Sequence, residues 1–114
     1  MSSVPQGLTI EPEQQGSELH VRVRGELDMS TAPQLATALS EAGRGPAETV
    51  VLDLSGVTFI DSSALRVLVQ SGRELSGAQR TLQIGPRSDM VARVLTMTSL
   101  DTHSDAFEVL PDPS

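Results

Sequence analysis

The feature that most constrains the fold of this chain is a buried strand that passes, through a short polar turn, into an amphipathic helix. The strand is the run Val50 to Leu54, which has the composition of a strand covered on both faces. The helix follows Asp61. Its apolar residues recur at helical spacing, at Leu65, Leu68, Val69 and Leu75. A strand and helix joined in this way predict an α/β fold.

The turn between them carries a carboxylate and two hydroxyls, Asp61, Ser62 and Ser63. A serine at this place stands at a helix N-terminus, where free N–H groups and the helix dipole favour an added negative charge. Such a serine suits phosphorylation better than nucleophilic catalysis. Asp and Ser are also the ordinary residues of a helix N-cap, so a plain helix start explains the same three residues.

The rest of the chain alternates between strand and helix patterns. We expect strands at 8–13, 19–24, 49–54, 81–84 and 106–110, and helices from Ser30 or Thr31 to Gly43, from Asp61 to Ser76 (closed by Gly77), and from Ser88 to Thr98. This order predicts a mixed sheet of four to five strands, parallel where helices intervene, with the helices packed mainly on one face. One domain would occupy residues 8–110, with flexible tails at 1–7 and 111–114.

Composition excludes several classes of function. The net charge of −7 and the presence of only two aromatic residues argue against direct binding to nucleic acid. Cysteine is absent, which excludes disulfides, thiolate catalysis and cysteine-based zinc sites. No apolar run is long enough to span a membrane and the N-terminus has no signal-peptide core, so we expect a cytoplasmic protein without membrane insertion.

Enzymatic chemistry has little support in the sequence. The two histidines, His20 and His103, are isolated, and no serine lies in a Gly-x-Ser-x-Gly motif. Clustered metal ligands and Gly-rich phosphate loops are also missing from the sequence. We therefore expect no catalytic residues, no metal and no cofactor.

Two segments resemble the motifs of one known family. The segment from Leu54 to Leu65, LSGVTFIDSSAL, is similar to the signature of the STAS domain (sulfate transporter and anti-sigma factor antagonist), and GELDMSTA at 25–32 resembles that family's second motif. The resemblance covers nearly the whole chain and implies the STAS fold. Two positions depart from the family pattern, because Ala64 and Ser99 stand where glycine is frequent. The methyl group of Ala64 would either narrow access to the serines or improve helix propensity.

The resemblance also implies roles for individual residues. Ser62 matches the serine that is phosphorylated in the antagonist branch of the family, Asp61 the acidic residue beside it, and Ser63 a serine that supports the loop. The loop at 25–31 would lie beside this site, with Leu27 in the core. The predicted partner-binding residues are Asp28, Ser30, Thr31, Asp61, Ser62, Ser63, Leu65 and Arg66.

The resemblance implies a regulatory protein, an anti-sigma factor antagonist. Its unphosphorylated form would bind an anti-sigma factor that is also a serine kinase, and so release the sigma factor. Phosphorylation of Ser62 would switch this binding off, and a PP2C-type phosphatase would restore it. A monomer is the default expectation. Two alternatives stay open: a soluble STAS subunit of a phospholipid-trafficking ABC transporter, and a scaffold component of a stress-signalling assembly.

Overall fold

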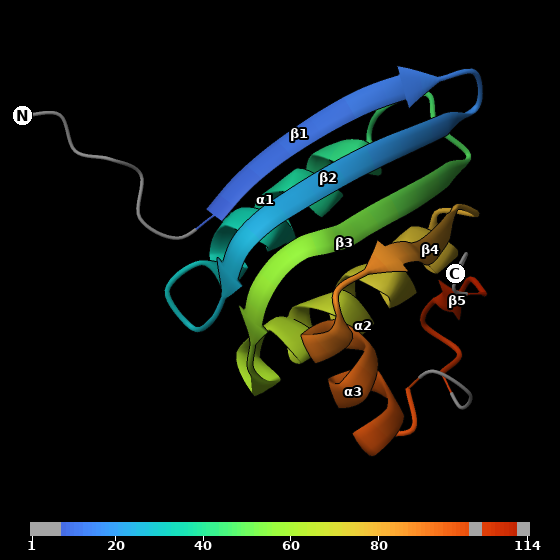
Figure 1. The fold of residues 1–114 in the computed structure, drawn as a ribbon. Helices are drawn as coiled ribbons and strands as arrows, with labels where there is room; N and C mark the ends of the chain where they lie inside the picture. Colours follow the sequence, from blue (N-terminus) through green and yellow to red (C-terminus); the bar gives the residue numbers. More distant parts are fainter. Residues whose placement is uncertain (1–7, 101–103, 112–114) are drawn as a thin grey trace, which may run out of the picture.

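The computed structural model describes residues 8–100 and 104–111, which form one five-stranded mixed sheet and three helices. The elements, in chain order, are β1 (Leu8–Gln15), β2 (Glu18–Leu27), α1 (Ala32–Ala42), β3 (Thr49–Ile60), α2 (Ser62–Gly77), β4 (Thr81–Arg87), α3 (Asp89–Met97) and β5 (Glu108–Val109). In Figure 1 the sheet lies in front, with the helices behind and beneath it. The predicted fold class is confirmed.

The strands lie side by side in sequence order, β1-β2-β3-β4-β5. A tight turn at Gly16 joins β1 and β2 as an antiparallel hairpin, while the pairs β2–β3, β3–β4 and β4–β5 are parallel. Each of the three parallel connections passes through a single helix, α1, α2 or α3, as is usual for crossover connections. The carboxyl ends of β2, β3 and β4 therefore point to the same edge of the sheet.

One hydrophobic core lies between the sheet and the helices. All three helices and the inner faces of the strands contribute to it. Its largest fully buried side chains include Leu27, Leu35, Leu39, Leu52, Leu54, Leu68, Leu82, Ile84 and Leu95. The burial of Leu27 confirms its predicted place in the core.

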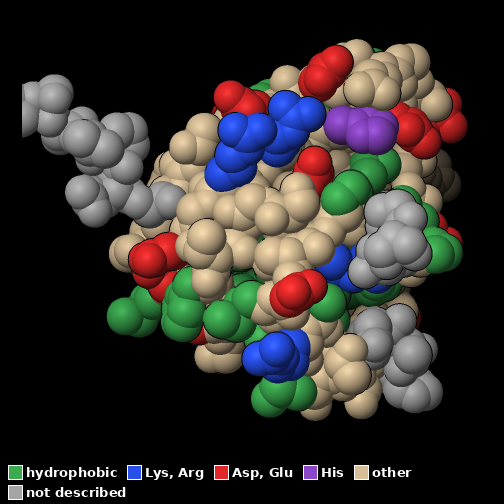
Figure 2. Space-filling view, viewed as in Figure 1, with side chains coloured by type: hydrophobic (Ala, Val, Ile, Leu, Met, Phe, Trp, Pro, Cys, Tyr) green, Lys and Arg blue, Asp and Glu red, His purple; other side chains and the backbone are tan. Residues whose placement is uncertain are grey.

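The opposite face of β1, β2 and β3 is charged. Arg22 in β2 lies between Glu11 of β1 and Asp53 of β3, at 3.9 and 3.8 Å, and His20 lies 2.9 Å from Glu18. Figure 2 shows these charged side chains gathered over the exposed face of the sheet. All of these side chains are partly solvated, so the ion pairs contribute little to stability and mainly keep this face of the sheet hydrated.

The strands differ in length from the expectation. β3 continues six residues beyond Leu54 to Ile60, and β4 continues through Gly85-Pro86 to Arg87. β2 also runs on through Gly25, where a loop was expected. Register shifts between β2 and β3 accompany this extension, and Gly25 adopts a φ of 111°. β5 is shorter than expected, with only Glu108 and Val109.

The end of α2 also differs from the expectation. Gly77, predicted to close this helix, is its last helical residue, and the left-handed turn is made by Gln79 at a φ of 65°. Arg80 N–H donates to the Leu75 carbonyl at 2.8 Å, the bond of a Schellman motif. At the end of α3, Ser99 makes the same turn at a φ of 61°. Ser99 is one of the two positions that depart from the STAS pattern, and a serine adopts the left-handed conformation there.

β1 forms one edge of the sheet, paired with β2 on one side only. Its middle residues are Glu11, Pro12 and Glu13, and Pro12 lies opposite Val21. Proline has no N–H that could donate to a further strand, and the two like-charged glutamates beside it disfavour edge-to-edge pairing.

Within the described residues, no helix is long and apolar enough to cross a membrane. The predicted tail at 1–7, most of the one at 111–114, and His103 lie outside the described residues. The predicted domain boundaries stay predictions.

Candidate functional site

The polar segments that follow β2 and β3 meet at one edge of the sheet. In the parallel register Leu27 lies opposite Ile60, the last residue of each strand. The Asp61 N–H donates to the Leu27 carbonyl at 3.1 Å, which ties the two chain segments together just beyond the strands. The loop that starts at Asp28 and the turn Asp61-Ser62-Ser63 are therefore neighbours.

Asp61 caps helix α2 with its side chain. Its Oδ1 accepts hydrogen bonds from the Ser63 N–H at 2.9 Å and from the Ala64 N–H at 3.3 Å. The backbone of Asp61 is extended, as expected at an N-cap. The predicted start of this helix is confirmed, and the carboxylate satisfies two N–H groups that would otherwise lack partners.

Ser62 is the first residue of α2 and its side chain is exposed. Among the described residues, its hydroxyl has no hydrogen-bonding partner, because Asp61 performs the capping. The oxygen is thus free to accept a phosphoryl group, and the positive end of the helix dipole favours the charge that this would add.

Asp28 organises the neighbouring loop. Its Oδ1 accepts from the Ser30 hydroxyl at 2.7 Å, the Ser30 N–H at 2.9 Å and the Thr31 N–H at 3.1 Å. The hydrogen bond from the Ser30 hydroxyl is the largest cause that holds the pKa of Asp28 below its ordinary value. Asp28 is therefore charged at neutral pH, and a carboxylate stands close to the Ser62 turn.

Thr31 was one of two residues expected to cap α1, and its position is as expected but its side-chain bond is not. It occupies the N-cap position but makes no side-chain cap, and Ser30 bonds to Asp28 instead. The Thr31 hydroxyl donates to the Glu26 carbonyl at 2.7 Å and accepts from the Asp28 N–H at 2.9 Å. Pro33 in the first helical turn has no N–H to satisfy, so less capping is needed there.

The remaining predicted residues differ in what they present to solvent. Arg66 is exposed and makes no ion pair with the described residues, whereas Leu65 and Ser63 are half-buried and Thr31 is 5% exposed. The side chain of Ala64 is fully buried, so its methyl group points into the core and does not narrow access to Ser62.

Two apolar residues at this edge were missed by the sequence analysis. Met29, in the loop after β2, is 76% exposed, and Phe59, the last but one residue of β3, is 43% exposed. Phe59 lies opposite Glu26 in the register, on the side of the sheet away from the buried Ile60 and Leu27. An apolar residue inside the polar run Asp28-Met29-Ser30 was the signal that could have identified Met29. Phe59 was missed because the predicted strand ended at Leu54, so its side chain was assigned to neither face of the sheet.

No cluster of three or more His, Asp or Glu side chains that could hold a metal ion is found in the described part of the chain. The side chains at this edge include the hydroxyls of Ser30 and Ser62, the carboxylates of Asp28 and Asp61, the Arg66 guanidinium, and the apolar Met29 and Phe59.

Comparison with known proteins gives consistent matches along nearly the whole chain. The family model described as "Mlab, STAS domain" matches residues 10–111. An anti-sigma-B factor antagonist of Staphylococcus aureus (strain NCTC 8325 / PS 47) is 30% identical over 93 residues, which cover 82% of this chain and 86% of that protein. The anti-sigma-F factor antagonist RsfB of Mycobacterium tuberculosis (strain CDC 1551 / Oshkosh) is 26% identical, covering 96% of this chain and 89% of that protein.

A solved structure is also similar over the full fold. The crystal structure of an anti-sigma factor antagonist from Mycobacterium paratuberculosis matches with a TM-score of 0.80 and 28% sequence identity, over 98% of this chain and 92% of that chain.

Proposed function

Since this chain belongs to the STAS domain family of anti-sigma factor antagonists, we propose that its unphosphorylated form binds an anti-sigma factor and so releases a sigma factor. Phosphorylation of Ser62 ends that binding. The protein is thus a binding module and a kinase substrate, and it acts by binding the anti-sigma factor.

The observation that carries the proposal is the division of roles between Asp61 and Ser62. Asp61 holds the N-terminus of α2 through two backbone N–H groups, while the adjacent Ser62 is exposed and its hydroxyl has no partner among the described residues. A hydroxyl that served as the cap would lose a structural bond on modification. Here the phosphoryl group can be added without breaking any bond of the fold.

A phosphoryl group changes the charge of this edge strongly. It adds roughly −1.5 to −2 charges at neutral pH. The carboxylates of Asp28 and Asp61 already stand there, so the modified edge repels an acidic partner and obstructs a closely fitting one. Arg66 follows Ser62 by four residues, one helical turn along α2, a spacing at which opposite charges on a helix interact. It is available to neutralise part of the new charge within the protein itself.

The apolar side chains at the same edge suit a protein partner. Phe and Met are enriched in the centres of protein interfaces, and a few such residues usually supply most of the binding energy. Met29 and Phe59 flank the Ser62 turn from the ends of β2 and β3. We assign them to the contact surface together with Asp28, Ser30, Asp61, Ser62 and Arg66. Thr31, Ser63 and Leu65 act mainly by holding that surface in shape.

The resemblance to the antagonist branch supports two further partners. The anti-sigma factor would itself be the serine kinase that modifies Ser62, and a PP2C-type phosphatase would remove the phosphate. Both enzymes need a serine that protrudes from its surroundings, a requirement that the exposed side chain of Ser62 meets. This cycle would take place in the cytoplasm, where sigma factors act.

The proposal is tested first by intact mass spectrometry of the protein recovered from its native cells. We expect a phosphate-sized increment in mass that disappears in Ser62→Ala. The increment should persist in Ser63→Ala, because Ser63 is half-buried and so less accessible to a kinase than the exposed Ser62. An increment that survives in Ser62→Ala would assign the modification to another residue.

Partner capture tests the binding half of the proposal. Immobilised Ser62→Ala should retain a kinase-like anti-sigma factor. Ser62→Asp should retain at least about tenfold less, because repulsion between the new carboxylate and an acidic partner surface typically costs more than ~1.4 kcal/mol in an interface. Ser40→Asp, which adds the same charge to an exposed position of α1, should bind like the wild type. Equal capture by Ser62→Asp contradicts the switch. Recovery of a membrane ATPase in place of an anti-sigma factor would favour a transporter subunit.

A further inference from the structure

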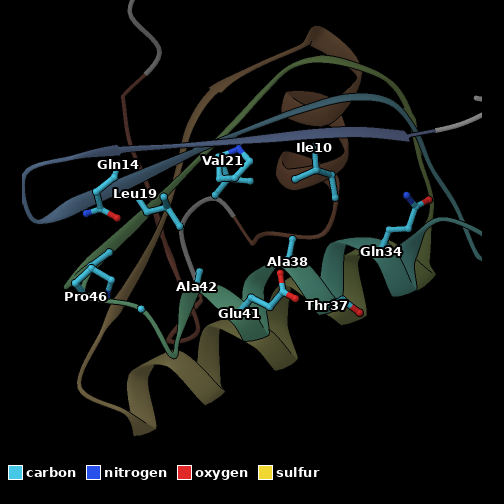
Figure 3. A pocket seen from close by; sticks show the side chains of 13 residues that line it. Ile10, Gln14, Leu19, Val21, Gln34, Thr37, Ala38, Glu41, Ala42 and Pro46 are labelled. Carbon is cyan, nitrogen blue, oxygen red and sulfur yellow. The ribbon is translucent and has the colours of Figure 1, made fainter.

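An open hollow of about 580 Å³ lies between helix α1 and the inner side of the hairpin β1–β2. Figure 3 shows Ile10, Leu19 and Val21 pointing from the sheet toward the helix, and Ala38 and Ala42 pointing back from α1. Pockets that bind small organic molecules measure roughly 300–1,000 Å³ and are lined mostly by apolar side chains. The hollow falls within that range.

The hollow exists because small side chains face large ones across a wide gap. On α1, Leu35 and Leu39 are fully buried in the main core, and the side of the helix that faces β1 carries Ala38, Ala42 and Thr37. The hollow is an open groove at the surface, with the buried Val21, Ala42 and Ala47 at its floor.

The charge of the lining restricts what the hollow can hold. Among the described residues that line it, Glu41 is the one charged side chain, and it makes no ion pair with any of them. Glu41 is exposed, and in Figure 3 its side chain lies along α1 at the rim of the hollow. The other polar side chains of the lining, among them Gln34 and Thr37, are uncharged. A carboxylate or phosphate group placed here would be repelled by Glu41 and would find no cation to compensate.

We propose that this hollow is a binding site for a small amphiphile with an apolar body and a single cationic head group. The body lies between the hairpin and α1, against the half-buried Ile10, Leu19 and Ala38, and the head pairs with Glu41 at the rim. Charge complementarity favours this occupant over a fatty acid or a nucleotide, since the protein as a whole carries a net charge of −7.

The site is separate from the edge that carries Ser62. Leu19 lies opposite Val50 near the amino end of β3, whereas Ser62 follows the carboxyl end of the same strand. The proposal therefore does not depend on the proposed regulatory function, and either can fail without the other.

The test uses the full chain, with chemical-shift perturbation of its backbone amides in NMR spectra as the measurement. The probes are decyltrimethylammonium and decanoate, which share a decyl-length body and differ in the sign of the head, with tetramethylammonium as the head alone. We expect saturable shifts confined to β1, the start of β2 and α1, with the cation binding about tenfold more tightly than the anion, as one favourable charge contact allows. Tetramethylammonium should produce no such shifts.

Two variants and one matched control locate the site. Ala38→Leu fills the hollow with a side chain that keeps helix propensity, and should abolish the saturable shifts. Glu41→Gln should bring the affinities of the two decyl probes together. Ala36→Leu makes the same change at a half-buried position of α1 outside the lining, and should bind like the wild type.

Three results would overturn the proposal. Decanoate binding as tightly as the cation would remove the role of Glu41, and unchanged binding in Ala38→Leu would place the probe elsewhere. Self-association that Ala38→Leu abolishes, with no saturable probe binding, would make the hollow a contact between two copies of the chain.

Discussion

Thr31 shows how one hydroxyl can set the shape of a contact surface without lying on it. The side chain is 5% exposed, and its oxygen bridges the Glu26 carbonyl and the Asp28 N–H across the turn between β2 and α1. Asp28, in turn, binds Ser30 and the Thr31 N–H through its carboxylate. The loop that presents Asp28 and Met29 is thus held by the hydrogen bonds of the buried Thr31 hydroxyl and by those of the Asp28 carboxylate.

Replacing Thr31 by valine should destabilise the protein by about 1–3 kcal/mol, because the Glu26 carbonyl and the Asp28 N–H both lose a partner in a place that water reaches poorly. Thr31→Ser keeps the hydroxyl and should lose no more than about 1 kcal/mol, for the missing methyl group. Urea denaturation gives both values. A Thr31→Val protein as stable as Thr31→Ser would show that the two hydrogen bonds contribute nothing.

The carboxyl group of Asp28 should titrate below its ordinary value of 3.8, chiefly because the Ser30 hydroxyl donates to the charged form. A group whose pKa is lowered on folding stabilises the fold above its unfolded pKa, and this contribution is lost as the pH falls through the folded pKa. Carbonyl-detected NMR titration would measure the midpoint. The titration should run from about pH 2 to about pH 6, so that it covers the ordinary carboxyl pKa and the range below it. In Ser30→Ala the midpoint should rise toward 3.8, and an unchanged midpoint would assign the shift to another cause.

At the scale of single residues, the sequence was informative where one interaction dominates. Asp61 was predicted as a cap because an acidic residue before a helical pattern has few other roles, and its two bonds to backbone N–H groups bear this out. The N-cap position of α1 was predicted but its side-chain bonding was not, because Asp28, Ser30 and Thr31 can satisfy one another in several ways. Which arrangement forms depends on Glu26, whose carbonyl is positioned by the register of β2 against β3.

At the scale of elements, helix α2 is held against the last part of the chain by a close approach at Gly72. A Cβ atom at this position would lie 2.1 Å from the carbonyl oxygen of Ala106. Only glycine allows the backbone of the segment before β5 to approach the helix this closely, and Ala106 and Phe107 are buried there.

Gly72→Ala should therefore destabilise the protein despite the better helix propensity of alanine. The propensity gain is about 1 kcal/mol, whereas overpacking against backbone usually costs about 1–3 kcal/mol and here forces the two segments apart. Gly77→Ala is the matched control in the same helix, since a Cβ there meets nothing within 4 Å, and it should be neutral or slightly stabilising. Thermal unfolding of the two variants should give Tm changes of opposite sign; a rise in both would contradict the close approach.

The order and type of the elements were predictable, and several of their ends were not. Alternation in β2 and helical spacing in α2 arise from burial on one side, which the sequence records directly. β3 was predicted to end at Leu54, where the β-branched and apolar run stops, yet the strand continues through Ser55 and Gly56 to Ile60. The neighbouring strand β2 pairs with this second half as far as Leu27, and such pairing overrides local preference.

At the scale of the whole molecule, one core joins the sheet to all three helices. We expect a single cooperative unfolding transition, in which the calorimetric and van't Hoff enthalpies agree within error. Leu35→Ala in α1 and Leu95→Ala in α3 should each lower the stability of that same transition by about 2–5 kcal/mol. A second transition appearing in either variant would mean that the helices unfold independently of one another.

The edge strand β1 has a consequence for how much of this protein a cell can contain. A protein that works by occupying its target, one molecule for one, has to be as abundant as that target, and crowding favours the stacking of open strand edges into larger particles. With Pro12 lacking an N–H and Glu11 and Glu13 beside it, a second copy that approaches this edge meets a missing donor and like charges. Three residues far from Ser62 thus disfavour strand-to-strand stacking at the concentrations that its proposed role demands.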